Sequence, residues 1–131
     1  ECFITSAKLS HDKRLAMLGA EIRRVIEKYS PTDMAIEQLF FNSNQKTAIK
    51  VAEARGVLLY EAALAKLEIY EYTPIEIKVA VTGYGRSTKE QVTAMVEKLV
   101  LMEKKKRVLD DEFDAIAVGL THIASKKFLS R

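Results

Sequence analysis

Three carboxylates from two parts of the chain could together hold a divalent metal ion. Glu37 ends the apolar run Met34-Ala35-Ile36, which has the character of a buried strand. Asp111 and Asp114 are three positions apart in an acidic segment near the C-terminal end, and this spacing puts them on one face of a helix. Hard oxygen ligands favour Mg²⁺ or Mn²⁺. A magnesium site built from a strand end and a helix face is therefore one interpretation.

The same acids also have an ordinary structural interpretation. A buried carboxylate is normally paired with a cation, protonated or bound to metal. Glu37 could pair with an Arg or Lys at a sheet edge, and the acidic segment could favour a helix N-terminus through the helix dipole. Spacing alone favours this interpretation slightly. His122, two turns after Asp114, could approach a metal site, donate a proton, or only satisfy a hydrogen bond, as lone histidines usually do.

Hydrophobic periodicity and helix-capping signals predict alternating helices and strands. The predicted elements are a helix capped at 10 and stopped by the proline at 31, a strand over 34–36, a helix over 45–66, a strand over 69–72, a helix from 87 to 100 and a final helix through 111–123. Ser87 and Glu90 have capping-box spacing at the start of the fifth element. The final helix is expected to bury Ile116, Leu120 and Ile123. This order predicts an α/β fold.

Composition narrows the class of protein without identifying it. The chain has 131 residues, of which 48% are hydrophobic, and this is enough for a single domain with one core. No apolar run is long enough to span a bilayer. The single cysteine, Cys2, excludes an intrachain disulfide and fits a cytoplasmic location. The net charge of +3 is compatible with nucleic acid, with basic runs at 104–107 and 126–127 beside the acidic segment.

Several short motifs occur in the order and approximate spacing of a known family. They are Ala35-Ile36-Glu37-Gln38-Leu39-Phe40, Ala54-Arg55-Gly56-Val57, Glu71-Tyr72, Ile77-Lys78, Gly83-Tyr84-Gly85, Lys89-Glu90-Gln91-Val92, Asp114-Ala115 and Thr121-His122. No single motif is specific, but together they extend over nearly the whole chain. On these residues the sequence resembles the RuvC family of bacterial Holliday junction resolvases.

The resemblance implies a ribonuclease H-like α/β fold, a mixed sheet flanked by helices, with residues 1–131 forming a single nuclease domain. It also implies an incomplete N-terminus. Residues 1–5 resemble the third strand of the family's fold, so its first two strands do not occur in this sequence. The first of those strands carries the family's first catalytic aspartate, in an Asp-Pro-Gly context. The sequence is thus a fragment of a longer protein or a version that has lost a metal ligand.

The resemblance also assigns roles to individual residues. Glu37, Asp111 and Asp114 are expected to bind Mg²⁺, with Mn²⁺ able to substitute, and His122 is a weaker catalytic candidate. Phe40 matches the aromatic that stacks on bases near the junction crossover. Lys78 and Lys89 match basic positions that contact or orient DNA, and Arg86 lies in a loop that is either a plain glycine turn or a DNA contact.

The implied activity is metal-dependent endonucleolytic resolution of four-way DNA junctions in recombination and repair. The implied partners are junction DNA, a second copy of the chain and a branch-migration motor, with no membrane. Ala48, Ala52 and Gly56 lie on the helix that forms the family's dimer interface, and small residues at this spacing suit close helix approach. Two alternatives remain: a junction-binding protein that is catalytically incomplete, and a ribonuclease H-like nuclease with another substrate.

Overall fold

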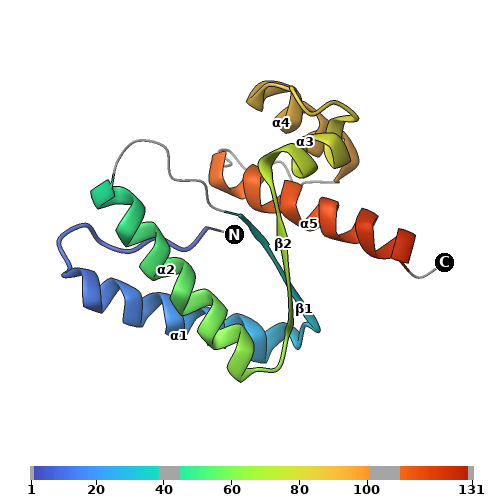
Figure 1. Ribbon diagram of the computed structural model, residues 1–131. Coiled ribbons are helices and arrows are strands. Elements are labelled where there is room, and N and C mark those ends of the chain that lie inside the picture. Colours follow the sequence, from blue (N-terminus) through green and yellow to red (C-terminus); the bar gives the residue numbers. More distant parts are fainter. Residues whose placement is uncertain (1, 39–44, 101–109, 130–131) are drawn as a thin grey trace. The chain divides into compact units, whose positions relative to one another are not determined.

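The computed structural model describes residues 2–38, 45–100 and 110–129 (Figure 1). Its elements, in chain order, are α1 (His11–Tyr29), β1 (Asp33–Glu37), α2 (Gln45–Leu64), β2 (Glu68–Tyr72), α3 (Pro74–Thr82), α4 (Lys89–Leu99) and α5 (Asp110–Leu129). The expected alternation of helices and strands is confirmed. The segment after Pro74 is also helical, because Thr73 and Glu76 form a capping box and Pro74 occupies the first turn.

β1 and β2 form a parallel pair joined through α2 (Figure 1). The backbone N–H of Glu68 donates to the carbonyl of Thr32 at one end, at 3.0 Å, and that of Gln38 donates to the carbonyl of Tyr72 at the other, at 2.8 Å. A parallel pair needs a crossover connection, and a helix normally supplies it. The α/β class expected from the sequence is therefore confirmed.

The chain divides into two compact units, and each holds one end of the strand pair. The α1–α2 unit comprises Phe3–Met34 and Leu39–Ile69. The α3–α5 unit comprises Ala35–Gln38 and Tyr70–Arg131, together with the N-terminal dipeptide. That both belong to one nuclease domain stays a prediction.

In the α1–α2 unit the close helix approach occurs at Gly19, which is buried. A Cβ atom at Gly19 would lie 3.3 Å from both Val57 and the Oε1 atom of Glu61. Nothing lies within 4 Å of a Cβ placed on Gly56. Helix α1 therefore meets α2 through Val57 and Glu61 rather than through Gly56, and the close approach of a second copy of the chain at Gly56 stays a prediction. Beside Gly19, Arg23 forms two hydrogen bonds with the buried Glu61, of 2.6 and 3.1 Å.

The core of the α3–α5 unit is a cluster of apolar side chains from its three helices. The buried members are Ile77, Val81, Val92, Val96, Phe113, Ala117 and Val118. Ile116 and Leu120 pack against this cluster, as expected, but Ile123 is 56% exposed. The prediction for Ile123 is wrong because α5 turns a different stripe, through Phe113, Ala117 and Thr121, toward the core.

The start of α4 also differs from the prediction by one residue. Thr88 is the N-cap, and it forms the capping box with Gln91 rather than Ser87 with Glu90. Ser87 is 3% exposed, and its hydroxyl donates to the carbonyl of Tyr84 at 2.7 Å. Both serine and threonine are good caps, so the choice follows from the loop, which uses the Ser87 hydroxyl internally. Helix α4 therefore begins at Lys89.

Residues 2–6 adopt no regular secondary structure, although the resemblance places a strand at 1–5. A strand needs a hydrogen-bonding neighbour, and the described residues supply none to this segment. None of the described helices is both long enough and apolar enough to cross a lipid bilayer.

Candidate active site

A cleft of about 230 Å³ opens on the α3–α5 unit and brings together residues from β1, α3, α4 and α5. Its lining residues are Glu37, Pro74, Ile77, Lys78, Lys89, Val92, Asp114 and Ala117. Three of them, Ile77, Val92 and Ala117, belong to the buried core, so the floor of the cleft is apolar and fixed by helix packing. The charged members are two carboxylates and two ammonium groups. Such a set can bind a metal ion together with an anionic substrate.

Glu37 and Asp114 both line this cleft and interact electrostatically. Glu37 is the last residue of β1, and Asp114 lies in the second turn of α5. Burial, and then the negative charge of Asp114, raise the pKa of Glu37. The structure therefore brings together two of the acids that the sequence singled out 77 positions apart. Among the described residues no Arg or Lys forms an ion pair with Glu37, contrary to the sheet-edge alternative.

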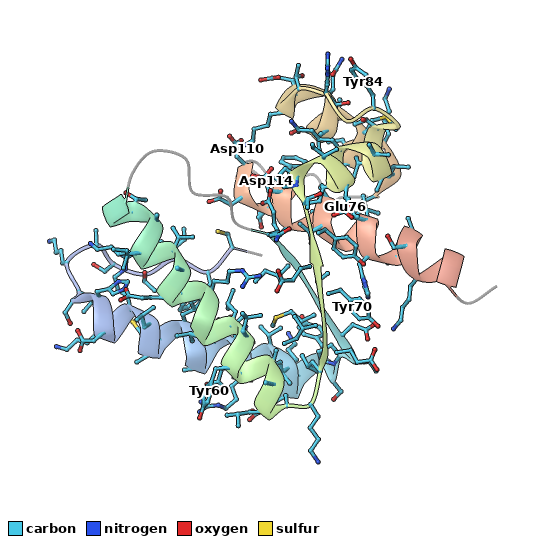
Figure 2. All side chains as sticks on the ribbon, in the orientation of Figure 1. Tyr60, Tyr70, Glu76, Tyr84, Asp110 and Asp114 are labelled. Atoms are coloured by element: carbon cyan, nitrogen blue, oxygen red, sulfur yellow. The ribbon has the colours of Figure 1, made fainter. Side chains whose placement is uncertain are left out.

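Lys89 holds the acidic start of α5 against the start of α4. Its Nζ atom lies 3.5 Å from the Oδ2 atom of Asp114 and 3.5 Å from that of Asp110. The negative charge of Asp114 raises the pKa of Lys89, burial opposes this shift, and the charge of Asp110 adds to it. Asp110 and Asp114 lie at the N-terminal end of α5 (Figure 2). Acidic side chains also favour this position through the helix dipole, so the structural interpretation of these acids is supported, and their metal-binding role stays a prediction.

Asp111 does not line the cleft, although it lies one turn before Asp114 on the same helix. It is exposed. Within residues 2–38, 45–100 and 110–129, no group of three or more acidic, histidine or cysteine side chains is arranged as a metal site. The structure thus assembles two of the three predicted ligands, and the place of Asp111 in the set stays a prediction.

The expected DNA-contacting residues are divided between the cleft and its surroundings. Lys78, on α3, and Lys89 both line the cleft. Arg86 is exposed in the connection between α3 and α4 and does not line it. Phe40 and the basic run at 104–107 lie outside the described residues.

His122 lies away from the cleft and has an aromatic environment. Its Nδ1 atom is hydrogen-bonded to the hydroxyl of Tyr72 at 2.9 Å, and its ring centroid is 4.6 Å from that of Tyr70. Tyr70 and Tyr72 alternate along β2 and so point to the same side. This is the hydrogen-bonding role left open for a lone histidine, and the structure does not bring His122 among the residues that line the cleft.

Two residues that matter here were not singled out from the sequence. Asp110 contacts Lys89. The sequence could have indicated this contact, because Asp110 lies four residues before Asp114 and the two therefore share one helix face. Tyr72 contacts His122, and the signal for it is the Tyr70-Glu71-Tyr72 alternation, which aims two aromatic rings at one neighbour.

The donor set of the cleft fits a hard divalent cation. Two carboxylates close enough for one to raise the pKa of the other are a like-charged pair that a cation would stabilise. Mg²⁺ is commonly held by one or two carboxylates while it keeps several waters and binds substrate phosphates. The residues present therefore suit Mg²⁺ or Mn²⁺ without any histidine or cysteine ligand.

Comparison with known proteins leads to one family. The family model described as "Crossover junction endodeoxyribonuclease RuvC" matches residues 1–122. A protein of that name from Moorella thermoacetica is 49% identical over 122 residues, which cover 93% of this chain and 72% of the relative. The structure of Thermus thermophilus RuvC aligns with a TM-score of 0.86 at 30% identity, over 98% of this chain and 76% of that one.

A second solved structure is T. thermophilus RuvC in complex with a Holliday junction substrate. It aligns with a TM-score of 0.85 at 30% identity and covers 95% of this chain and 74% of that one. The family model spans most of the chain, and the relative from Moorella thermoacetica is identical at close to half of the aligned positions. The structural likeness to T. thermophilus RuvC leads to the same assignment. The chain belongs to the RuvC family of crossover junction endodeoxyribonucleases.

Proposed function

We propose that this chain forms the cleavage cleft of a nuclease that resolves Holliday junctions in DNA recombination and repair. The observation that carries the proposal is the cleft itself, which holds two acids, Glu37 and Asp114, and two lysines, Lys78 and Lys89, over an apolar floor. The family membership supplies the reaction. Phosphodiester hydrolysis adds a water oxygen to phosphorus and breaks its bond to the 3′ oxygen of the preceding nucleotide, which leaves a 3′ hydroxyl and a 5′ phosphate.

Glu37 and Asp114 would hold the divalent metal, with Mg²⁺ as the ion and Mn²⁺ as a substitute. When bound there, the metal supplies a water of lowered pKa and neutralises charge on the phosphate and the leaving 3′ oxygen. The chain's own task is to hold the two carboxylates ionised and converging. The raised pKa of Glu37, which comes from burial and then from the charge of Asp114, supports this role, because both causes disfavour an ionised Glu37 without a cation. Metal binding would relieve that repulsion.

Lys78 and Lys89 would bind the phosphates on either side of the bond that is cut. Lys78 comes from α3 and Lys89 from the first residue of α4, so the two ammonium groups reach the cleft from different helices. Lysine binds phosphate as a point charge and releases counterions from the DNA. Arg86, in the exposed connection between these helices, and Phe40 would extend the DNA contact beyond the cleft.

Asp111 is proposed as the third acid of the metal site. Three residues along a helix correspond to about 4.5 Å of rise, so Asp111 is one turn away from Asp114. An ion bound between Glu37 and Asp114 would draw a nearby carboxylate toward it. His122 is not proposed as an acid or base, because Tyr72 already holds its Nδ1 atom and the residue does not line the cleft.

A second copy of the chain is the proposed partner for the exposed side of α2. Ile49, Ala52, Gly56, Tyr60 and Leu64 recur at helical spacing there and are all exposed. Small residues permit close approach of a second helix, while the larger apolar ones supply area to bury. A two-fold dimer would present two equivalent clefts to a four-way junction. A branch-migration motor and a cytoplasmic location are further expectations of this function.

A junction-binding role without cleavage is the second candidate. One observation favours it: the described acids do not form a group of three. The lysines of the cleft would still bind DNA in such a protein. Only the metal chemistry separates the two candidates.

The test is cleavage of a synthetic four-way junction in Mg²⁺, with linear duplex as control and junction binding measured in the same samples. The wild-type protein should nick the junction and leave the duplex intact. Asp114→Asn and Asp111→Asn should each abolish nicking while junction binding in EDTA persists, whereas Asp110→Asn should reduce it only modestly. Junction-selective binding without nicks by the full-length wild-type protein would establish the second candidate instead.

A further inference from the structure

The aromatic cluster around His122 joins the strand pair to α5. Tyr70 projects from β2 toward α5 (Figure 2), and its ring centroid lies 4.6 Å from that of His122 at an interplanar angle of 44°. Lys126, one turn further along α5, places its Nζ atom 5.9 Å from the centroid of the Tyr70 ring. The Tyr72 hydroxyl and His122 Nδ1 are hydrogen-bonded at 2.9 Å. The side of β2 that carries Tyr70 and Tyr72 therefore packs on the part of α5 from His122 to Lys126.

The two carboxylates of the cleft come from the elements that this cluster joins. Glu37 belongs to β1, while Asp114 belongs to α5. The backbone carbonyl of Tyr72 accepts a hydrogen bond of 2.8 Å from the N–H of Gln38, the residue next to Glu37. Tyr72 therefore holds the Glu37 end of β1 through its backbone and α5 through its side chain. A continuous path of contacts runs from Glu37 through Tyr72 and His122 to the helix that carries Asp114.

The hydrophobic core contributes few contacts to the position of the strands relative to α5. Its buried members come from α3, α4 and α5, and they fix those helices against each other. From the strands, Ala35 and Tyr72 pack against the cluster. His122 follows Asp114 by eight residues, about 12 Å along the helix. At that distance a small rotation of β2 against α5 would displace Glu37 from Asp114.

We propose that Tyr72 and His122 are positioning residues for the cleavage reaction: their hydrogen bond fixes β2 against α5 and thereby sets the separation of Glu37 and Asp114. The proposal rests on the function proposed above, in which those two acids hold the metal. Metal ligands depend on surrounding hydrogen bonds for their orientation, and losing such a contact typically reduces metal affinity or activity about 10- to 100-fold. Tyr72 and His122 would act in this way without touching metal or DNA.

The test compares three single variants of the full-length protein, and the double variant Tyr72→Phe/His122→Leu, with wild type. Tyr72→Phe removes only the hydroxyl. His122→Leu removes the imidazole ring and with it the Nδ1 atom that is hydrogen-bonded to Tyr72. His122→Asn is the conservative variant, because its side-chain amide can take the place of Nδ1 and donate to the Tyr72 hydroxyl. The readouts are Mn²⁺ binding without DNA by calorimetry, the Mg²⁺ concentration for half-maximal single-turnover cleavage, junction binding in EDTA, and Tm.

Tyr72→Phe and His122→Leu should each weaken Mn²⁺ binding about 10-fold and raise the half-activating Mg²⁺ concentration similarly. The double variant should be no worse than His122→Leu alone, and His122→Asn should keep most of the affinity. Junction binding in EDTA should not change. The matched control is Val96→Ala, which opens a cavity at a fully buried position of α4. It should lower Tm and leave Mn²⁺ affinity unchanged.

Two results would overturn the proposal. One is that Tyr72→Phe and His122→Leu lower Tm but bind Mn²⁺ like wild type. The other is that Val96→Ala weakens Mn²⁺ binding as much as they do, which would make the contact merely stabilising. A wild-type protein that neither binds Mn²⁺ nor cuts the junction would instead remove the proposed function, and this inference with it. Wild-type cleavage separates that outcome from the first two.

Discussion

Lys89 and Asp114 are joined by an ion pair of 3.5 Å that links the start of α4 to the start of α5. The same aspartate raises the pKa of Glu37 across the cleft. Asp114 therefore interacts with both the Lys89 ammonium and the Glu37 carboxylate, and a shift of its side chain would affect both groups. Because the acids raise the pKa of Lys89, its ammonium stays protonated at neutral pH and cannot act as a general base there. Its proposed contribution to cleavage is therefore its positive charge.

Replacing Lys89 by Met should reduce single-turnover cleavage of a four-way junction about 100-fold, because a preorganised charge aimed at the phosphate is lost. Asp110 and Asp114 would also be left without their shared cation. The matched control is Lys98→Met, at the exposed last turn of the same helix, which should cleave at the wild-type rate. Equal rates for the Lys89 and Lys98 variants would show that the cleft does not use this charge.

Glu37→Gln should separate activity from stability. Cleavage should fall by about 100-fold or more, since a negative charge that binds metal is replaced by a neutral amide. In EDTA the variant should be at least as stable as wild type at pH 7. The reason is that the native pKa of Glu37 is raised, so the native state holds this proton more tightly than the unfolded chain does.

The sign of the pH dependence follows from the same shift. The contribution of Glu37 to stability is fully present below its ordinary value of 4.5 and is lost as pH rises through the raised native pKa. Urea unfolding in EDTA at pH 4 and pH 7 should show that wild type loses this increment and that Glu37→Gln does not. Glu97→Gln, at an exposed position of α4, should behave like wild type. A wild-type stability that rises with pH relative to Glu37→Gln would contradict the shift.

Much of the candidate site could be predicted from the sequence because its residues occur in short motifs that resemble those of a known family. Glu37, Lys78, Lys89 and Asp114 all come from such motifs, and all line the cleft. The exact start of α4 could not be predicted, since Ser87 and Thr88 are both good caps and only the loop structure decides between them. The exposure of Ile123 could not be predicted either, because periodicity identifies an apolar stripe but not which neighbour each residue meets.

The two helical glycines of the α1–α2 unit should respond in opposite directions to larger residues. Gly56→Ala should stabilise the protein by about 1 kcal/mol, because nothing lies near its Cβ and alanine favours a helix. Gly19→Leu should destabilise it by about 1–3 kcal/mol, since Val57 and Glu61 already lie 3.3 Å from a Cβ there. Both changes in the free energy of unfolding are measured by urea unfolding at a protein concentration too low for self-association. A destabilising Gly56→Ala under these conditions would mean that the described chain packs against this side of α2.

Two exposed tyrosines allow the proposed dimer surface to be tested with a matched pair. Tyr60 lies in the apolar stripe of α2 and is 62% exposed, while Tyr29 ends α1 and is 64% exposed. If a second copy covers α2, Tyr60→Lys places a charge in an interface that should be apolar, and burying an unpaired charge is strongly unfavourable. Sedimentation of the full-length protein should show Tyr60→Lys as a monomer and Tyr29→Lys as a dimer. Paired nicks on opposite sides of the junction should then become independent single nicks in Tyr60→Lys only. Dimers of both variants would place the interface on another surface of the chain.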